Sequence, residues 1–297
     1  MAFNSPEVEI LGITTVYGNV PTALATRNAI RLRELAGRRE VPVAEGSHVS
    51  YLGAAKNRIA DFVHGSDGFG NTNQPPPEGR PVAESAAQFI VDTVNAHPGE
   101  VTILALAPFT NLALALQWDP SIAAKVGKIV MMGGAVACNG NVNPAAEANM
   151  FGDPEAADLV LGCAANTYLI GLDVTHSCFM PNELRETLQG KAGRFAQMTY
   201  DITEFYMRYT AKAFGKEGVF LHDPACLAGI LHPEWFTWQE GAVRVCCDGI
   251  ARGQTVMDLG LKNWVGDNPW LGRPPIKVAR EVDAEKVVAF CFERFSR

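Results

Sequence analysis

Carboxylate, amide and imidazole groups lie close together in two short segments of the chain. Glu147 and Asn149 are separated by one residue, and His222 and Asp223 are adjacent and precede a proline. Alternate residues point to the same side of an extended chain. A carboxylate and an amide on one side of such a segment suit the vicinal hydroxyls of a sugar. We therefore predict that Glu147 and Asn149 bind a sugar from an extended segment.

The segment around Asp223 has two interpretations. Aspartate is a good N-cap and proline suits the first helical position, so these residues could simply start a helix. The same Asp-Pro pair precedes helix-like runs at 119–120 and 153–154. The alternative is that His222 and Asp223 are a pair of chemical groups. The spacing alone leaves both interpretations open.

The elements that must position these groups alternate along the first half of the chain. Strand-like apolar runs are separated by helix-like runs and lie at 8–16, 41–46, 101–107, 128–134 and 167–174. This pattern indicates an α/β fold with a mostly parallel sheet covered by helices on both faces. Ligands of such sheets bind beyond the carboxyl ends of the strands. The loops after the strands are therefore where we expect the site.

The second half of the chain has a different pattern. Apolar residues recur at every third or fourth position over 195–209, which predicts a long helix with an aromatic stripe in the core. The segment 242–260 is typical of two strands around a turn, and 275–282 of a further strand. We find no internal repeat and no linker, so we expect one domain over residues 1–297, with a small extra hairpin and helices in its C-terminal half.

Composition excludes several classes of protein. The net charge is −7 and no run of lysine and arginine occurs, so nucleic acid and anionic membranes are not expected partners. No stretch reaches the roughly 18 uninterrupted apolar residues of a transmembrane helix. The glycines of HGSDGFG are in the wrong order for a dinucleotide-binding loop, which disfavours a nicotinamide-dependent dehydrogenase.

Cysteine usage indicates the compartment. The 7 cysteines are scattered and lack CxxC spacing, as expected of reduced thiols in a cytoplasmic protein. A zinc site would need a tighter group of ligands than His176 and Cys178 provide.

Seven segments carry a family resemblance, and they occur in one order over nearly the whole chain. They are NSPEVEILGITTVYGNV, ATRNA, RIADFVHGSDGFGN, LAPFTNLALAL, MMGGAVACNGNVNPAAEANMFGDPEAAD, GLDVTH and VFLHDPA. Together they resemble the inosine–uridine nucleoside hydrolases, and look closest to the plant-type uridine ribohydrolases. The resemblance implies hydrolysis of the N-glycosidic bond of a ribonucleoside to ribose and free base, in nucleoside salvage and degradation. Uridine is the substrate that the resemblance favours, with inosine and xanthosine as further candidates.

The resemblance also implies a cofactor and an assembly. One Ca²⁺ is expected to bind the 2′- and 3′-hydroxyls and the attacking water. The physical chemistry agrees, because Ca²⁺ takes about six to eight oxygen ligands and lowers the pKa of bound water. Members of the family are commonly dimers or tetramers, so a homo-oligomer is expected.

Individual roles follow position by position from the resemblance. Asp223 resembles a calcium-ligating aspartate that also caps a helix, and Thr110 resembles the residue that gives a backbone carbonyl to the ion. His222 resembles the histidine near the leaving base, as an acid or orienting donor, and His64 resembles a second histidine on the base side. The remaining residues resemble the ribose-binding groups: Asn19, Glu147 and Asn149 at the ring hydroxyls, Asn141 at the 5′-hydroxyl, and Met132 in the pocket lining.

One segment of the family pattern is not found. The aspartate cluster D-x-D-P-G-x-D-D precedes NSPEV in the family, but NSPEV begins at Asn4 in this sequence. We therefore expect a chain that is N-terminally truncated relative to the family, either because Met1 is internal to a longer natural chain or because this is a real short form. Losing the general base should cost at least ~10²–10⁴-fold in rate. The alternative function is a non-catalytic nucleoside- or ribose-binding subunit that pairs with a full-length relative.

Overall fold

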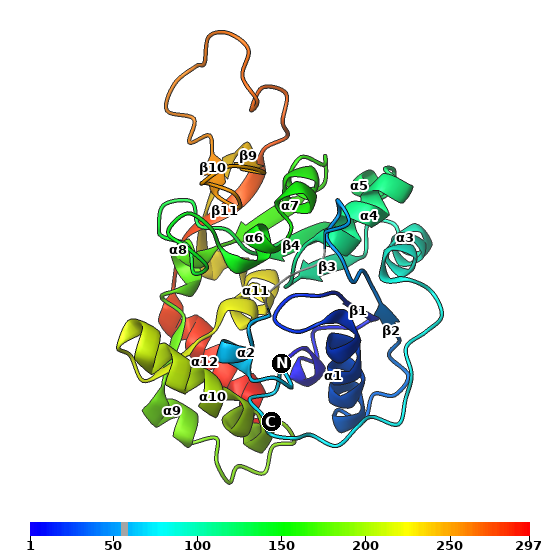
Figure 1. Cartoon of the computed structure of the whole chain (residues 1–297), viewed down its shortest axis with the longest axis vertical. Coiled ribbons are helices and arrows are strands. Elements are labelled where there is room, and N and C mark those ends of the chain that lie inside the picture. Colours follow the sequence, from blue (N-terminus) through cyan, green and yellow to red (C-terminus); the bar gives the residue numbers. More distant parts are fainter. Residues whose placement is uncertain (55–58) are drawn as a thin grey trace.

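The computed structural model describes residues 1–54 and 59–297, and its centre is a five-stranded sheet (Figure 1). The strand order is β3-β4-β5-β11-β8, in which the first four strands are parallel and β8 runs antiparallel at the edge. The strands are β3 (Thr102–Ala105), β4 (Lys128–Met132), β5 (Thr167–Ile170), β11 (Ile276–Val282) and β8 (Phe236–Gly241). The predicted mostly parallel sheet is confirmed, whereas β8 was not foreseen.

Alternating residues of the central strands belong to two separate hydrophobic cores. Ile129 and Met131 of β4 belong to one core, and Val130 and Met132 belong to the other. Successive strand residues point to opposite faces, so both faces of the sheet are buried. One core packs against α3 (Ala86–Ala96), α4 (Thr110–Trp118) and α7 (Pro154–Leu161), and the other against α11 (His222–Leu231) and α12 (Ala284–Ser296). The expected helical cover of both faces is therefore present.

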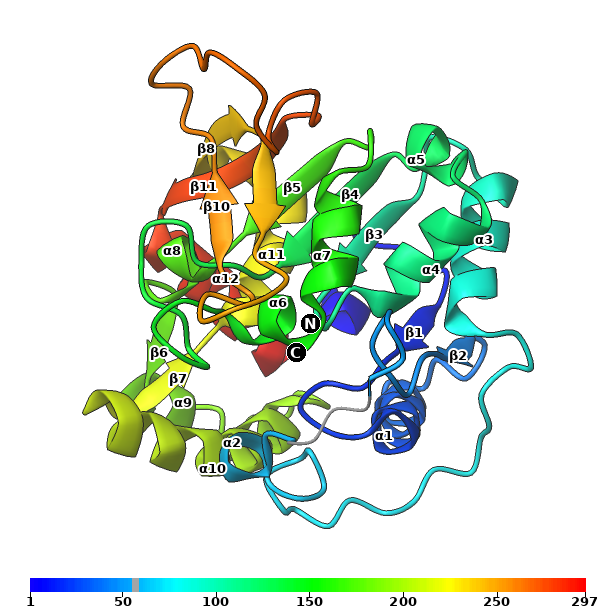
Figure 2. The ribbon, with the colours of Figure 1, turned by 45° about the horizontal axis from the view of Figure 1, so that its top comes forward.

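The N-terminal strands form a separate parallel pair. β1 (Ile13–Thr15) pairs only with β2 (Val43–Glu45), and neither is hydrogen-bonded to β3 among the described residues. Both strands are shorter than the predicted runs 8–16 and 41–46. Pro42 explains part of the difference, because it has no N–H with which to extend the ladder before Val43. Helix α1 (Thr22–Leu35) packs on this pair. The pair and the helix lie on the β3 side of the central sheet (Figure 2).

The remaining elements are short except for one helix. That helix is α10 (Ala196–Phe214), which confirms the long helix predicted around 195–209. The others are α2 (Asp61–His64), α5 (Ile122–Lys125), α6 (Ala148–Gly152), α8 (Leu172–Thr175) and α9 (Asn182–Glu186), the 3-10 turns Ala2–Asn4 and Pro233–Trp235, and the antiparallel pairs β6 (Phe179–Pro181) with β7 (Gly218–Phe220) and β9 (Val243–Val245) with β10 (Thr255–Met257). No described helix is long and apolar enough to cross a bilayer.

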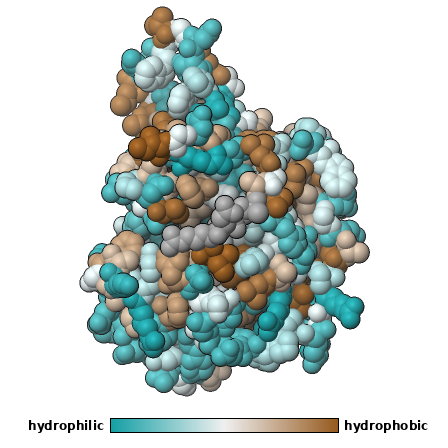
Figure 3. Space-filling model, viewed as in Figure 1, coloured by the Kyte–Doolittle hydropathy of each residue, from teal (hydrophilic) through white to brown (hydrophobic). Residues whose placement is uncertain are grey.

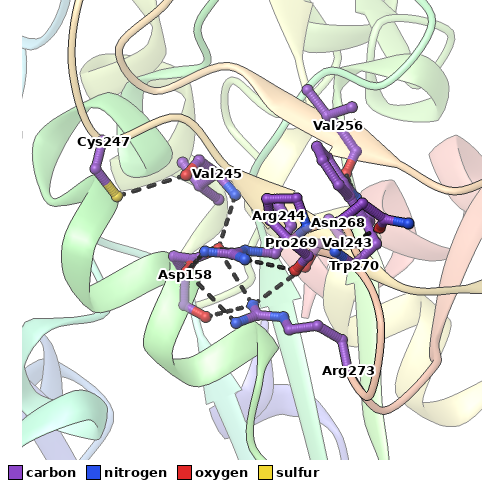
Figure 4. A network of polar contacts seen from close by, with 10 residues as sticks. All are labelled: Asp158, Val243, Arg244, Val245, Cys247, Val256, Asn268, Pro269, Trp270 and Arg273. Atoms are coloured by element: carbon purple, nitrogen blue, oxygen red, sulfur yellow. Dashed lines mark hydrogen bonds and ion pairs between the residues drawn. The ribbon is translucent and has the colours of Figure 1, made fainter. Parts of the chain in front are cut away.

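The carboxylates of Asp158 and Glu155 fasten the hairpin β9–β10 to α7, and Glu155 does so through Arg252 at 2.6 Å. Asp158 lies between two guanidinium groups, 2.8 Å from Arg244 Nε and 3.2 Å from Arg273 Nη2 (Figure 4). Its Oδ1 also accepts a hydrogen bond from the backbone N–H of Val245. Beyond this anchor, the chain between β10 and β11 forms an arm that projects from the body of the molecule (Figure 1).

Candidate active site

The loops after β3 and β4 meet at the carboxyl ends of the parallel strands. The side-chain amide of Asn149 joins them: its Nδ2 donates to the carbonyl of Met132 at 3.0 Å and to that of Leu106 at 3.4 Å. Met132 is the last residue of β4, and Leu106 follows β3 directly. Asn149 therefore ties together two strand ends at the edge where ligands of parallel sheets bind.

Glu147 is fixed by backbone N–H groups on several sides. Its Oε2 accepts from Gly134 and Met150, each at 3.1 Å, and both carboxylate oxygens accept from Asn149 at 2.9 Å. It is the N-cap of α6, and Asn149 lies inside that helix, so the prediction of an extended segment is wrong. Spacing by two residues is shared by a strand face and by a capping side chain that bonds the second helical N–H.

Burial governs the charge of Glu147. The side chain is 2% exposed, and this desolvation raises the pKa of its carboxyl, against the opposing effect of the backbone hydrogen bonds. The Glu147 carboxylate already accepts hydrogen bonds from backbone N–H groups at the start of α6. A ribose hydroxyl would therefore have to share these carboxylate oxygens with the backbone.

Asp223 has a contrasting environment. It lies in the first turn of α11, whose N-cap is Leu221 without a side-chain hydrogen bond, so the prediction that Asp223 caps this helix is wrong. Solvent reaches the residue, yet surrounding protein and the nearby Glu147 raise the pKa of its carboxyl to about 7. No hydrogen bond to this carboxylate is present among residues 1–54 and 59–297. The Asp223 carboxylate is therefore accessible to solvent although protein surrounds it.

His222 stands next to Asp223 and is held by Thr175. The Thr175 hydroxyl is 2.8 Å from His222 Nδ1. Burial, followed by the nearby His176 and His64, lowers the pKa of His222 to about 3. The ring is therefore a neutral imidazole at physiological pH. Where Thr175 donates its hydroxyl hydrogen to Nδ1, the other ring nitrogen carries the N–H.

Aromatic rings from α10 and β7 surround the two predicted histidines. The ring centroids of His64 and Tyr206 are 5.6 Å apart, and those of Phe220 and His222 are also 5.6 Å apart. Tyr206 stacks with Tyr209 at 6.4 Å, and burial raises the pKa of the Tyr206 hydroxyl ahead of the effect of Asp223. Burial also lowers the pKa of His64 to about 4. Tyr206 therefore lies close enough to Asp223 for the charge of that carboxylate to act on its hydroxyl.

His176 also lies among the rings around His222, and its position in the sequence suggested only a zinc ligand. Its ring centroid is 5.7 Å from that of His222, and its Nε2 is buried without a hydrogen-bond partner. The segment GLDVTH contained the signal, because Thr175 and His176 both contact His222.

Three further predicted residues lie outside this group. The side chain of Asn141 accepts the backbone N–H of Ala148 at 2.9 Å, so it braces α6. Asn19 is exposed, and its carbonyl accepts from Ala60 just before α2. Thr110 is buried, and its hydroxyl donates to Asp153 at 2.6 Å. The carbonyl oxygens that accept from Asn149 belong to Leu106 and Met132, which makes Leu106 a further candidate for a carbonyl ligand.

Comparison with known proteins decides the family. The model of the inosine-uridine preferring nucleoside hydrolases matches residues 1–289. The chain belongs to this family.

Nucleoside hydrolases of known name resemble the chain along nearly all of its length. It is 49% identical to probable uridine nucleosidase 2 of Arabidopsis thaliana, over 99% of this chain and 91% of the relative. It is 51% identical to probable uridine nucleosidase 1 of Oryza sativa subsp. japonica, over 99% of this chain and 90% of the relative. A solved plant nucleoside hydrolase, PpNRh1, superposes with a TM-score of 0.98 at 44% identity, covering 99% and 93% of the two chains.

A calcium ion in this nucleoside hydrolase would need more oxygens than the described residues offer. Asp223 supplies an accessible carboxylate that forms no ion pair with the described residues, and Leu106 supplies a carbonyl. No group of three His, Cys, Asp or Glu side chains arranged to hold a metal occurs in residues 1–54 and 59–297. Because Ca²⁺ prefers about six to eight oxygens, these donors alone do not complete its shell.

Proposed function

We propose that this nucleoside hydrolase cleaves the N-glycosidic bond of ribonucleosides, with uridine as the preferred substrate and inosine or xanthosine as slower ones. The observation that carries the proposal is the position of Asp223, an accessible carboxylate close to two groups of residues, which we call the polar floor and the aromatic wall. The floor holds Glu147 and Asn149, and the wall holds His222 and Tyr206. A ribonucleoside has the matching halves, a polyol and a flat base.

The polar floor would act on the sugar. Cleavage of a glycosidic bond passes through an oxocarbenium-like state in which positive charge develops on the ring. The negative charge of Asp223 and the carbonyl oxygens of Leu106 and Met132 would stabilise that charge, since they are fixed before the reaction begins. Asn149 keeps the two carbonyls in place through its amide.

The aromatic wall would act on the base. Tyr206 and Tyr209 offer ring faces to a nucleobase, and stacking of this kind tolerates different bases. His222, held by Thr175, would orient the base or give a proton to the leaving nitrogen. His64 and His176 lie close enough to depress the pKa of His222 and to share this role.

Calcium remains part of the proposal as the ion that the family resemblance implies. Asp223 and the Leu106 carbonyl would hold it, together with oxygens that these residues do not supply. When bound, the ion would supply Lewis-acid activation of water. A loss of uridine hydrolysis in EDTA that Ca²⁺ alone restores would support this role, and full activity in EDTA would exclude it.

Assembly and compartment belong to the same proposal. The arm after β10 exposes large apolar side chains, among them Leu261 at 85% and Val265 at 100%, and Figure 3 shows brown surface on it. Exposed apolar surface of this kind marks contact sites, so we expect a homo-oligomer, to be checked by light scattering. All 7 cysteines are free, as expected in a reducing cytoplasm.

The experiment is an assay of ribose release from uridine, cytidine, inosine and xanthosine by the purified chain. Ribose production above the uncatalysed rate supports hydrolysis, and its absence with every nucleoside contradicts it. Calorimetric binding of uridine without turnover would instead favour the non-catalytic nucleoside-binding subunit. A His222→Ala variant separates the roles at the wall: it should lose about 10²-fold with uridine but far less with 4-nitrophenyl riboside, whose leaving group needs no proton.

A further inference from the structure

A second pocket lies between α1 and the loop that follows α2. Its volume is about 290 Å³, and its polar lining comes from Arg27, Asn28 and Arg31 on the helix and from Asp67, Asn73 and Gln74 on the loop. It shares no residue with the floor or the wall of the candidate active site. The loop is tied to the helix directly, because Asn28 Nδ2 donates to the carbonyl of Asp67 at 2.8 Å.

Two arginines in this pocket lack partners in the part of the chain that the structure describes. Arg27 and Arg31 are four residues apart, so they lie on the same face of α1, where like charges destabilise a helix. Neither forms a hydrogen bond or ion pair within residues 1–54 and 59–297, and Nε of Arg31 is shielded from solvent without an acceptor. Leaving a buried donor unsatisfied is costly, which indicates that something else accepts from it.

Neighbouring arginines on the same part of the chain behave differently. Arg33 donates to the carbonyl of Val41 at 2.9 Å. Arg38 pairs with Glu40, and Arg39 with Glu78 at 2.9 Å. Each of these three guanidiniums thus has at least one partner, although Nε of Arg33 is also buried without an acceptor. Arg27 and Arg31 differ from them because no nitrogen of either guanidinium has a partner among the described residues.

Asp67, the one acid among the described lining residues, accepts hydrogen bonds within its own loop. Asp67 Oδ1 accepts the backbone N–H groups of Phe69 at 2.7 Å and of Asn71 at 2.8 Å. Its Oδ2 accepts that of Asn73 at 3.2 Å. The carboxylate thus shapes the loop without pairing with the guanidiniums, and the pocket keeps an excess of positive charge in a chain whose net charge is −7.

We propose that this pocket binds the phosphate group of a small metabolite. A guanidinium presents a planar fork of donors that matches phosphate oxygens, and two such forks on one helix face can hold a single phosphate from two sides. The amide of Gln74 is a further donor within reach of the pocket lining. Leu24, Phe69 and Pro75 add apolar walls that suit the carbon skeleton of a phosphate ester.

The test is calorimetry with inorganic phosphate as the probe, against chloride at equal ionic strength. We expect saturable phosphate binding that weakens about tenfold in Arg27→Gln and again in Arg31→Gln, since bonds to charged groups are worth about 1.5–3 kcal/mol and 1.4 kcal/mol is tenfold. Arg39→Gln is the matched control and should bind as the wild type does. Arg27 is exposed, so its variant should fold even where that of Arg31 does not.

Two arms distinguish the sources of the phosphate group. Ribose 5-phosphate that competes with inorganic phosphate and binds more tightly supports a phosphate ester, and equal affinity supports phosphate itself. Ribose without phosphate should not compete. Absence of saturable binding, or equal affinity in wild type, Arg27→Gln and Arg31→Gln, would overturn the proposal without touching the proposed hydrolysis.

Discussion

Glu147 and Asp223 both lie near the start of a helix, yet their surroundings are opposite. Glu147 caps α6 and Asp223 lies in the first turn of α11, and the two carboxylates are close enough that Glu147 raises the pKa of Asp223. Glu147 is buried and accepts hydrogen bonds from three backbone N–H groups. Asp223 is accessible and accepts none among the described residues. One acid holds the site together, and the other is left available for a ligand.

The largest expected effect tests the available acid. Asp223→Asn removes the negative charge at the centre of the site, so uridine hydrolysis should fall by at least about 100-fold, as when a group that stabilises a transition-state charge is removed. Stability should stay the same or rise in EDTA, because an uncompensated charge in an enclosed site opposes folding.

The check on this prediction is kcat from ribose release together with Tm. Asp92→Asn on the exposed face of α3 is the control and should change neither quantity. A large drop in Tm with retained kcat would reverse the assignment of the two acids.

The second effect tests the structural acid. Glu147→Gln places an amide group against backbone N–H donors, which should cost roughly 1–3 kcal/mol of unfolding free energy and lower activity with it. Urea denaturation measures the first quantity. Glu285→Gln, in the exposed first turn of α12, is the matched control. An unchanged denaturation midpoint in Glu147→Gln would show that the buried hydrogen bonds carry no stability.

A third substitution changes the surroundings of Glu147 and leaves both acids in the sequence. Gly134 has φ of +83° and donates its N–H to Glu147, and a Cβ there would lie 2.9 Å from Thr255 Oγ1. Gly134→Ala should lose about 1–2 kcal/mol from the left-handed backbone alone, plus the cost of the clash. Gly190→Ala is the control, because Gly190 has φ of +75° and open space. Equal losses of unfolding free energy in the two variants would remove the clash from the account.

The smallest effect is expected beside Asp223. Thr175→Val keeps the shape of the residue but removes the hydroxyl that holds His222. The lost hydrogen bond corresponds to a decrease of about three- to tenfold in kcat for uridine. Activity with 4-nitrophenyl riboside should not change, because that substrate needs no proton. Thr203→Val on α10 is the control, since its hydroxyl bonds only its own helix. Equal decreases in kcat with both substrates would show that the substitution acts through folding and not through proton transfer to the leaving base.

The sequence predicted the scaffold well because its signals are local. The continuous apolar runs of β3, β4 and β5 predict both the strands and the burial of their two faces. The short strands β6 and β7 escaped notice because three residues give no periodicity. β1 and β2 were overextended because a β-branched run does not reveal where a partner stops, and Pro42 ends the pairing.

The candidate site was predicted in part, and the misses have physical causes. Residue types identified His222 and Asp223 as neighbours of chemical interest. Glu147 and Asn149 were placed on an extended segment because a cap and a strand face share the spacing of two. Leu106 could not be found, since a backbone carbonyl leaves no trace in the residue type. His176 depended on how α8 turns toward α11, which is a tertiary feature.

The most direct test of the whole account is a crystal structure of the Asp223→Asn variant with uridine bound. The account predicts that ribose hydroxyls lie within hydrogen-bond distance of residue 223 and of the Asn149 side chain. It also predicts that the base lies against His222 and Tyr206. A nucleoside bound elsewhere, or one whose base faces Glu147 and whose ribose faces Tyr206, would contradict it.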